Sequence, residues 1–196
     1  MKTFESLPEG YVEIFSVDLK NNKRLMLLVN GIALVIAALL VVPMCFLVPI
    51  APLFSMDKGM LSYMLRFGGL IVFSILYIVL HELVHGAAMR LCGTKRVKYG
   101  FTGLYAFAGS SDFYGKGAYI FIALAPVVLW GIVLAVVNVL VPIEWFWVIY
   151  FLQIFNLSGA AGDFYVTAKF SAMPSDILVS DSGVSMRVYA KNKGPL

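Results

Sequence analysis

Charged side chains are scarce in this sequence. Only 13% of the 196 residues are Asp, Glu, Lys or Arg, whereas 61% are hydrophobic, and the mean hydropathy is +0.89. Soluble domains are about one quarter charged and about half apolar, so this composition excludes an ordinary soluble domain and indicates a membrane protein. The length allows a single domain.

Cysteines are also few, and no leader is recognisable. Cys45 and Cys92 are the two cysteines; they form no metal-type pair and imply no disulfide framework, so we expect each to be a small packing residue. The first 24 residues are polar and of mixed charge, without the short apolar core of a cleaved signal. Insertion is therefore expected to rely on internal segments.

Long uncharged runs are what the sequence has instead. A spanning helix needs about 20 apolar residues, and four such spans are predicted, at about 25–54, 67–91, 118–141 and 145–166. Three prolines near the far end of the first run predict that this end is kinked or unwound; they are Pro43, Pro49 and Pro52.

The basic residues indicate the orientation of these spans. Of the 15 Lys and Arg residues, 13 lie before the first span, around the loop between the second and third spans, or after the fourth. Only Lys58 and Arg66 lie in the first external loop, and none in the second. Because basic residues favour the cytoplasmic side, residues 1–24 and the tail 169–196 are predicted to be cytoplasmic, with a transmembrane core at 25–168. The net charge of +4 is then explained by the orientation of the chain in a lipid bilayer, and we expect no nucleic-acid partner.

The segments outside the spans are β-like. Residues 11–19 alternate in polarity, residues 177–189 predict two short strands around a turn, and residues 97–109 predict a hairpin. The hairpin is either surface decoration or a holder of substrate by strand addition. The predicted fold class is an all-α polytopic membrane protein with four transmembrane helices and small cytoplasmic β-like hairpin elements.

An H-E-x-x-H pattern lies within the second span. His81 and His85 are the only histidines of the chain, and residues i and i+4 project from one helix face, so both can reach one Zn²⁺. Glu82 is rotated by about 100° from His81, beside the metal, and is predicted to be the general base. Two alternatives stay open: interior histidines hydrogen-bonded to neighbouring helices, or a proton or ion relay.

A catalytic zinc site usually has three protein ligands and an open position. No histidine remains, so the third donor must be a carboxylate or a cysteine. At about 1.5 Å per residue, His81 and His85 lie ~22 and ~28 Å inward from the outer end of their span, and Asp163 lies about 27 Å inward along the fourth. Asp163 is therefore the best candidate on depth, and Cys92 is too far along its own helix.

Four other polar residues receive weaker interpretations. Asn156 precedes Asp163 by two helical turns and is predicted to bind substrate or the oxyanion, with a plain interhelical hydrogen bond as the alternative. Asp112, Asp176 and Asp181 lie in polar segments and are expected to be turn or solvated residues.

Several stretches carry a family resemblance: H-E-L-V-H-G, I-A-L-A-P at 122–126, N-L-S-G-A-A-G-D at 156–163 and a tail containing P-S-D-I-L-V-S-D-S-G. Together they resemble the putative zincin peptidase family of small bacterial membrane proteins, which is distantly similar to the site-2 proteases. The resemblance covers the chain from about the first span to residue 189. It implies His81, His85 and Asp163 as ligands of one zinc ion and Glu82 as the catalytic base. Site-2 proteases carry the aspartate in a Leu-Asp-Gly setting, whereas Asp163 is flanked by Gly162 and Phe164.

We therefore expect a zinc-dependent peptidase embedded in the cell membrane, acting on membrane proteins or peptides near the membrane. The alternative is a non-enzymatic transporter or scaffold that retains a metal or proton site. A third interpretation is a zinc hydrolase that cleaves another bond, such as a lipid amide.

Overall fold

The computed structural model describes residues 3–18, 21–103 and 105–192. Three lysines of the charge argument and two leucines of the predicted β segments lie outside the described residues: Lys2, Lys20, Lys193, Leu19 and Leu104. The chain forms two compact units. Unit 1 comprises Met1–Leu28, Glu82–Pro126 and Asp163–Leu196, and unit 2 comprises Val29–His81 and Val127–Gly162.

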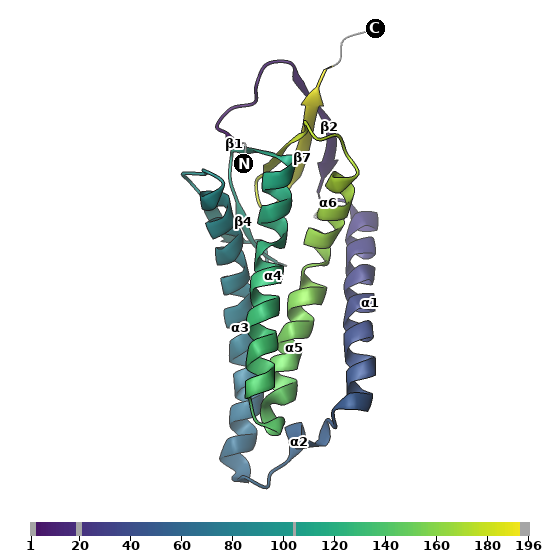
Figure 1. Cartoon of the computed structure of the whole chain (residues 1–196), viewed down its shortest axis with the longest axis vertical. Coiled ribbons are helices and arrows are strands. Elements are labelled where there is room, and N and C mark those ends of the chain that lie inside the picture. The colour runs from purple at the N-terminus through teal and green to yellow at the C-terminus, as the bar shows by residue number, and fades with distance from the viewer. Residues whose placement is uncertain (1–2, 19–20, 104, 193–196) are drawn as a thin grey trace. The chain divides into compact units, whose positions relative to one another are not determined.

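Helices make up most of the described chain (Figure 1). They are α1 (Lys23–Leu47), α2 (Ala51–Phe54), α3 (Gly59–Leu91), α4 (Lys116–Leu140), α5 (Ile143–Gly159) and α6 (Ala161–Ser171). The strands are β1 (Thr3–Phe4), β2 (Tyr11–Val17), β3 (Lys98–Phe101), β4 (Ala106–Gly109), β5 (Phe113–Gly115), β6 (Leu178–Asp181) and β7 (Met186–Lys191).

Three helices of the described chain, α1, α3 and α4, are long and apolar enough to cross a membrane, which indicates a membrane protein. The fourth predicted span differs from its prediction because it is divided. Helix α5 has 17 residues and ends at Gly159, and α6 begins at Ala161. Glycine is a poor helix former, and the Ser158 hydroxyl bonds back to the Ile154 carbonyl at 2.7 Å, which also weakens a helix locally.

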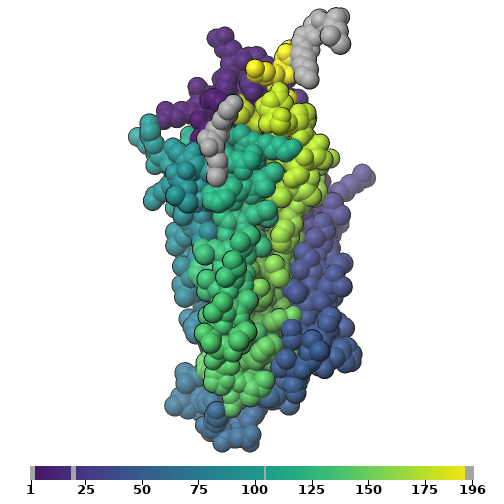
Figure 2. Space-filling view, viewed as in Figure 1, coloured from purple at the N-terminus to yellow at the C-terminus, as the bar shows by residue number. Residues whose placement is uncertain are grey.

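Helix α1 begins where Asn22 caps it, since the Asn22 side-chain oxygen accepts the Leu25 N–H at 3.0 Å. It ends at Leu47, two residues before Pro49, which confirms the predicted interruption of this span. No residue of α1 is fully buried, and its side chains are visible on the surface in Figure 2. Cys45 is exposed on this helix, contrary to the expected packing role, whereas Cys92 is buried.

Helix α3 has 33 residues and so extends for about 50 Å. It begins eight residues before the predicted span. Its end is a Schellman motif: Gly93 has φ +105°, the Gly93 N–H bonds to the Arg90 carbonyl and the Thr94 N–H to the Met89 carbonyl. The metal-type motif therefore lies in the last third of a single unbroken helix.

Unit 1 contains a five-stranded antiparallel sheet of order β1-β5-β6-β7-β2. Strand β2, which precedes every helix, pairs with β7, which follows every helix (Figure 1). The predicted strands over 11–19 and 177–189 are confirmed, and β3 and β4 form the predicted hairpin over 97–109. The buried face of the sheet packs with the end of α3, the start of α4 and α6; its core includes Met89, Tyr114, Ile122, Phe170 and Val188.

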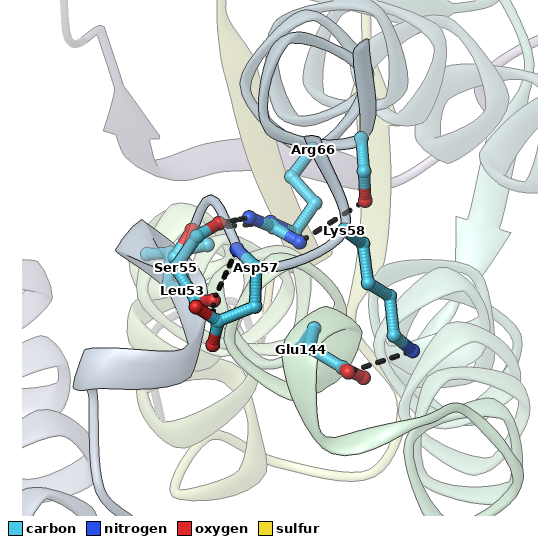
Figure 3. A network of polar contacts seen from close by, with 7 residues as sticks. Leu53, Ser55, Asp57, Lys58, Arg66 and Glu144 are labelled. Atoms are coloured by element: carbon cyan, nitrogen blue, oxygen red, sulfur yellow. Dashed lines mark hydrogen bonds and ion pairs between the residues drawn. The ribbon is translucent and has the colours of Figure 1, made fainter. Parts of the chain in front are cut away.

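Unit 2 is centred on α5, where Trp147 and Val148 are fully buried. The Trp147 indole N–H donates to the Pro49 carbonyl at 3.0 Å and so holds the segment after α1. Arg66, placed by the sequence in an external loop, instead lies inside α3 and is 1% exposed. It donates to the carbonyls of Leu53 and Ser55 at the end of α2 (Figure 3).

Candidate metal centre

Helix α3 presents His81, Glu82 and His85 over two turns. The i, i+4 spacing places both imidazoles on one face of the helix, and Glu82 lies on the adjacent face. All three residues belong to the single helix α3. His81 is 9% exposed, and the His85 side chain is 12% exposed.

His81 is held from within unit 2. Its Nδ1 lies 2.9 Å from the Tyr77 hydroxyl, one turn earlier on α3, and the two rings meet edge to face at 5.7 Å. Tyr77 also donates to the Asn156 side-chain oxygen at 2.9 Å, and the Asn156 amide nitrogen donates to the Val127 carbonyl at 3.1 Å. Asn156 is fully buried. Both ends of its amide therefore have partners inside the protein, as the hydrogen-bond alternative for this residue predicts.

His85 is held from within unit 1. Its Nδ1 lies 2.9 Å from the carbonyl oxygen of Ile122 on α4. Its Nε2 lies 3.6 Å from a carboxylate oxygen of Asp163. Because a carbonyl only accepts, the contact with Ile122 places a proton on Nδ1.

Asp163 lies in the first turn of α6. The break at Ala160 that divides the predicted fourth span creates this helix start. A carboxylate is stabilised at a helix N-terminus by the exposed N–H groups and the helix dipole. The Asp163 side chain is 19% exposed, so the carboxylate is partly screened from solvent.

Glu82 faces the β3–β4 hairpin. Its carboxylate accepts a hydrogen bond from the backbone N–H of Ala108 on β4. Gly86 lies one helical turn after Glu82 on the same face of α3. A Cβ placed at Gly86 would come 1.9 Å from the Tyr99 hydroxyl oxygen on β3. Tyr99 and Ala108 are direct partners in the hairpin. The hairpin therefore lies directly on the α3 face that carries Glu82.

A second carboxylate nearby, Asp181, was expected to be a turn or solvated residue, and the structure agrees with the turn alternative. Asp181 is 6% exposed; it accepts the Tyr119 hydroxyl at 2.7 Å and the Gly183 N–H at 2.8 Å. Burial raises the pKa of the Asp181 carboxyl, although these two hydrogen bonds oppose the shift. The turn at Gly183 is at the surface, whereas the Asp181 carboxylate is covered by Tyr119 of α4.

The donor set fits a zinc ion. His81, His85 and Asp163 each offer a ligand atom, and these atoms all lie within 4.8 Å of one another. Tetrahedral ligands about 2.1 Å from a zinc ion are about 3.4 Å apart, close to the 3.6 Å between His85 and Asp163. Two imidazoles with a carboxylate are a common zinc donor set. The arrangement is consistent with a metal site.

Comparison with known proteins agrees with this geometry. The family described as "Putative zincin peptidase" matches residues 74–178, more than half of the chain. The chain belongs to this family. The match includes the H-E-x-x-H motif and extends past Asp163. The family supports a zinc-dependent peptidase as the broad class of this protein.

A protein of Pyrococcus woesei is similar to this zincin-type chain. It is described as an uncharacterized 24.7 kDa protein in the gap 5′ region, and it is 32% identical over 126 residues. The alignment covers 62% of this chain but only 54% of that protein, so the chain spans about half the length of this relative. No solved structure matches the chain.

The sequence did not single out several residues around the centre. Tyr77 is one of ten tyrosines, and the acceptor for His85 is a backbone carbonyl, which has no residue type to recognise. One signal was available: Pro126 lies four residues after Ile122, and proline removes the N–H that would otherwise bond to that carbonyl.

Proposed function

We propose that this protein is a zinc-dependent peptidase that cleaves peptide bonds of membrane proteins or peptides at or near the membrane. The observation that carries the proposal is the approach of His85 to Asp163 beside His81, with Glu82 adjacent on the same helix. Family membership supports peptide hydrolysis over other zinc chemistry.

Each residue has a distinct role in this proposal. His81, His85 and Asp163 hold the ion, which when bound supplies an activated water and polarises the scissile carbonyl. Glu82 accepts a proton from the attacking water and passes it to the leaving amine. Two neutral imidazoles and one carboxylate leave a divalent site with a net charge of about +1, which suits a developing oxyanion.

The β3–β4 hairpin is the proposed support for the substrate. It lies against Glu82 through Ala108, and within the described sheets β4 pairs only with β3. An extended peptide can add to such a strand through backbone hydrogen bonds. A substrate helix must unwind locally before attack, since its peptide bonds are otherwise held in intrahelical hydrogen bonds.

Strand pairing supports four membrane crossings. One sheet joins β2, which precedes α1, with β5, which lies between α3 and α4, and with β7, which follows α6. A hydrogen-bonded sheet cannot continue through a bilayer, so these strands share one side. The chain then returns to that side after α1 and α3, and again after α4 and the α5–α6 segment. The basic residues favour the cytoplasm as that side.

Replacing Glu82 with Gln tests the proposal. Glu82→Gln keeps the three ligands and removes the base, so purified protein should retain one zinc ion while cleavage falls at least 100-fold, within the range that general bases contribute. Zinc is measured by elemental analysis, with His81→Ala as the metal-poor control. Cleavage is measured by comparing membrane peptides from cells that express each variant.

Three outcomes would contradict the proposal. Metal-free wild-type protein would favour a transporter or scaffold. Unchanged cleavage products in Glu82→Gln would show that the site is structural. Products that are lipids rather than peptides would assign the centre to another hydrolytic reaction.

A further inference from the structure

Both candidate histidines bond through Nδ1 to a partner that is not a metal ligand. For His85 the partner is the Ile122 carbonyl at 2.9 Å, and for His81 it is the Tyr77 hydroxyl at 2.9 Å. A histidine can present only one nitrogen lone pair while neutral, so the partner of the other nitrogen decides which one that is.

The acceptor for His85 depends on a proline. In α4 the Ile122 carbonyl would normally accept the N–H of residue 126, but that residue is Pro126, which lies inside the helix and has no N–H. A buried carbonyl without a partner is costly, and Ile122 is 1% exposed. The His85 Nδ1–H takes the place of the missing donor.

The acceptor for His81 is the Tyr77 oxygen, and the hydrogen bonds from Tyr77 to Asn156 and from Asn156 to Val127 show why. The Val127 carbonyl only accepts, so the Asn156 amide nitrogen faces it and the Asn156 oxygen faces Tyr77. Tyr77 gives its single hydroxyl proton to that oxygen. Its own oxygen must then accept from the Nδ1–H of His81.

We infer that Pro126 and the Tyr77–Asn156 pair are positioning residues that fix His85 and His81, respectively, in the Nδ1–H form before any metal binds. Each neutral imidazole then presents its Nε2 lone pair, so no exchange between tautomers is needed for metal binding. This inference rests on the proposed metal site. It gives Asn156 an indirect role, through His81, in place of contact with substrate.

Nitrogen NMR of the metal-free protein tests the inference directly. The chain has only two histidines, so ¹⁵N-histidine labelling gives one pair of ring signals for each. In detergent, at a pH where the imidazoles are neutral, both wild-type rings should show a protonated Nδ1. Pro126→Ala supplies an N–H for the Ile122 carbonyl and should shift only His85 toward the other tautomer. Tyr77→Phe should shift only His81.

Zinc affinity and thermal stability complete the test. Zinc titration should show a dissociation constant about 10–100-fold weaker in both variants, as expected when a partner of a metal-bound histidine is lost. The thermal midpoint of Pro126→Ala should be unchanged or higher, because alanine restores a helical hydrogen bond. A merely structural proline would instead lose stability and leave both tautomers unchanged.

Matched controls are available elsewhere in the chain. Pro43→Ala replaces a proline in the interior of α1, and Tyr150→Phe removes a tyrosine hydroxyl that donates to the Leu40 carbonyl at 3.0 Å. Both should leave the histidine signals and zinc affinity unchanged. An unchanged His85 tautomer in Pro126→Ala, or shifts of both histidines in every variant, would overturn this inference. Absence of zinc binding in wild-type protein would overturn the proposed function instead.

Discussion

Gly86 is a residue of helix α3 that lies directly against Tyr99 of the β3–β4 hairpin. A Cβ there would lie 1.9 Å from the Tyr99 hydroxyl oxygen and 2.6 Å from the ring carbon that bears it. The rigid Tyr99 ring would have to move as a whole. Since Ala108 of the same hairpin donates to Glu82, a displaced hairpin also disturbs the proposed base.

We predict that Gly86→Ala lowers the free energy of unfolding by about 1–3 kcal/mol, the usual cost of overfilling a packed contact. Thermal unfolding in detergent measures the change. Gly68→Ala is the matched control, because Gly68 lies in the same helix with open space around it. Adding Tyr99→Ala to Gly86→Ala should restore most of the loss. Equal effects of Gly86→Ala and Gly68→Ala would exclude the close approach as the cause.

The part of the candidate site that could be predicted from the sequence is the part recognisable by residue type and spacing. His81, Glu82 and His85 follow from the motif, and Asp163 follows from depth, although zinc binding by these residues stays a prediction. The burial of Asp181 could not be predicted, because a turn sequence does not reveal that the Tyr119 hydroxyl lies against its carboxylate. Asn156 gave two equal interpretations because its partners, Tyr77 and Val127, lie 79 and 29 residues away.

At the scale of elements, α2 depends on a buried cation. Arg66 donates to the carbonyls of Leu53 and Ser55 and to the Ser62 hydroxyl at 3.3 Å. Leu53 lies in the last turn of the short helix and Ser55 just after it, so neither carbonyl has a partner within the helix. The exposed Lys58–Glu144 ion pair, at 2.8 Å, lies close to this network (Figure 3).

We predict that Arg66→Met lowers the free energy of unfolding by about 3 kcal/mol, because buried hydrogen bonds to a charged group are lost and carbonyls are left unpaired. Lys58→Ala should cost less than about 1 kcal/mol, since Lys58 is 64% exposed and solvent screens its ion pair. Denaturant titration of both variants in the same detergent gives the comparison. A larger effect of Lys58→Ala would contradict the assigned role of Arg66.

The ends of helices and strands could be predicted from the sequence where an apolar run or an alternating pattern ended. The prolines after Leu47 and the alternation in β2 are examples of such local signals. One feature was not local. Arg66 is accommodated in α3 because the carbonyls of Leu53 and Ser55 accept its hydrogen bonds. The division of the fourth span had a local signal, Ser158 and Gly159, within an otherwise apolar run.

At the scale of the whole molecule, strand pairing and charge together predict the topology. We expect Lys58→Cys to react with a membrane-impermeant maleimide on intact cells, and Lys95→Cys and Asp176→Cys to react only after the membrane is opened. Cys45→Ser serves as the background because Cys45 is exposed. Labelling in detergent confirms that each site is accessible. Reaction of Asp176→Cys from outside would exclude the fourth crossing.

The pairing of β2 with β7 has a consequence for biogenesis. The ribosome releases β2 before any helix and its partner β7 only after every helix. The sheet therefore stays incomplete until translation has passed residue 191. If the chain crosses the membrane four times, as proposed, we expect that a chain missing one crossing leaves β7 across the bilayer from β2 and cannot close the sheet.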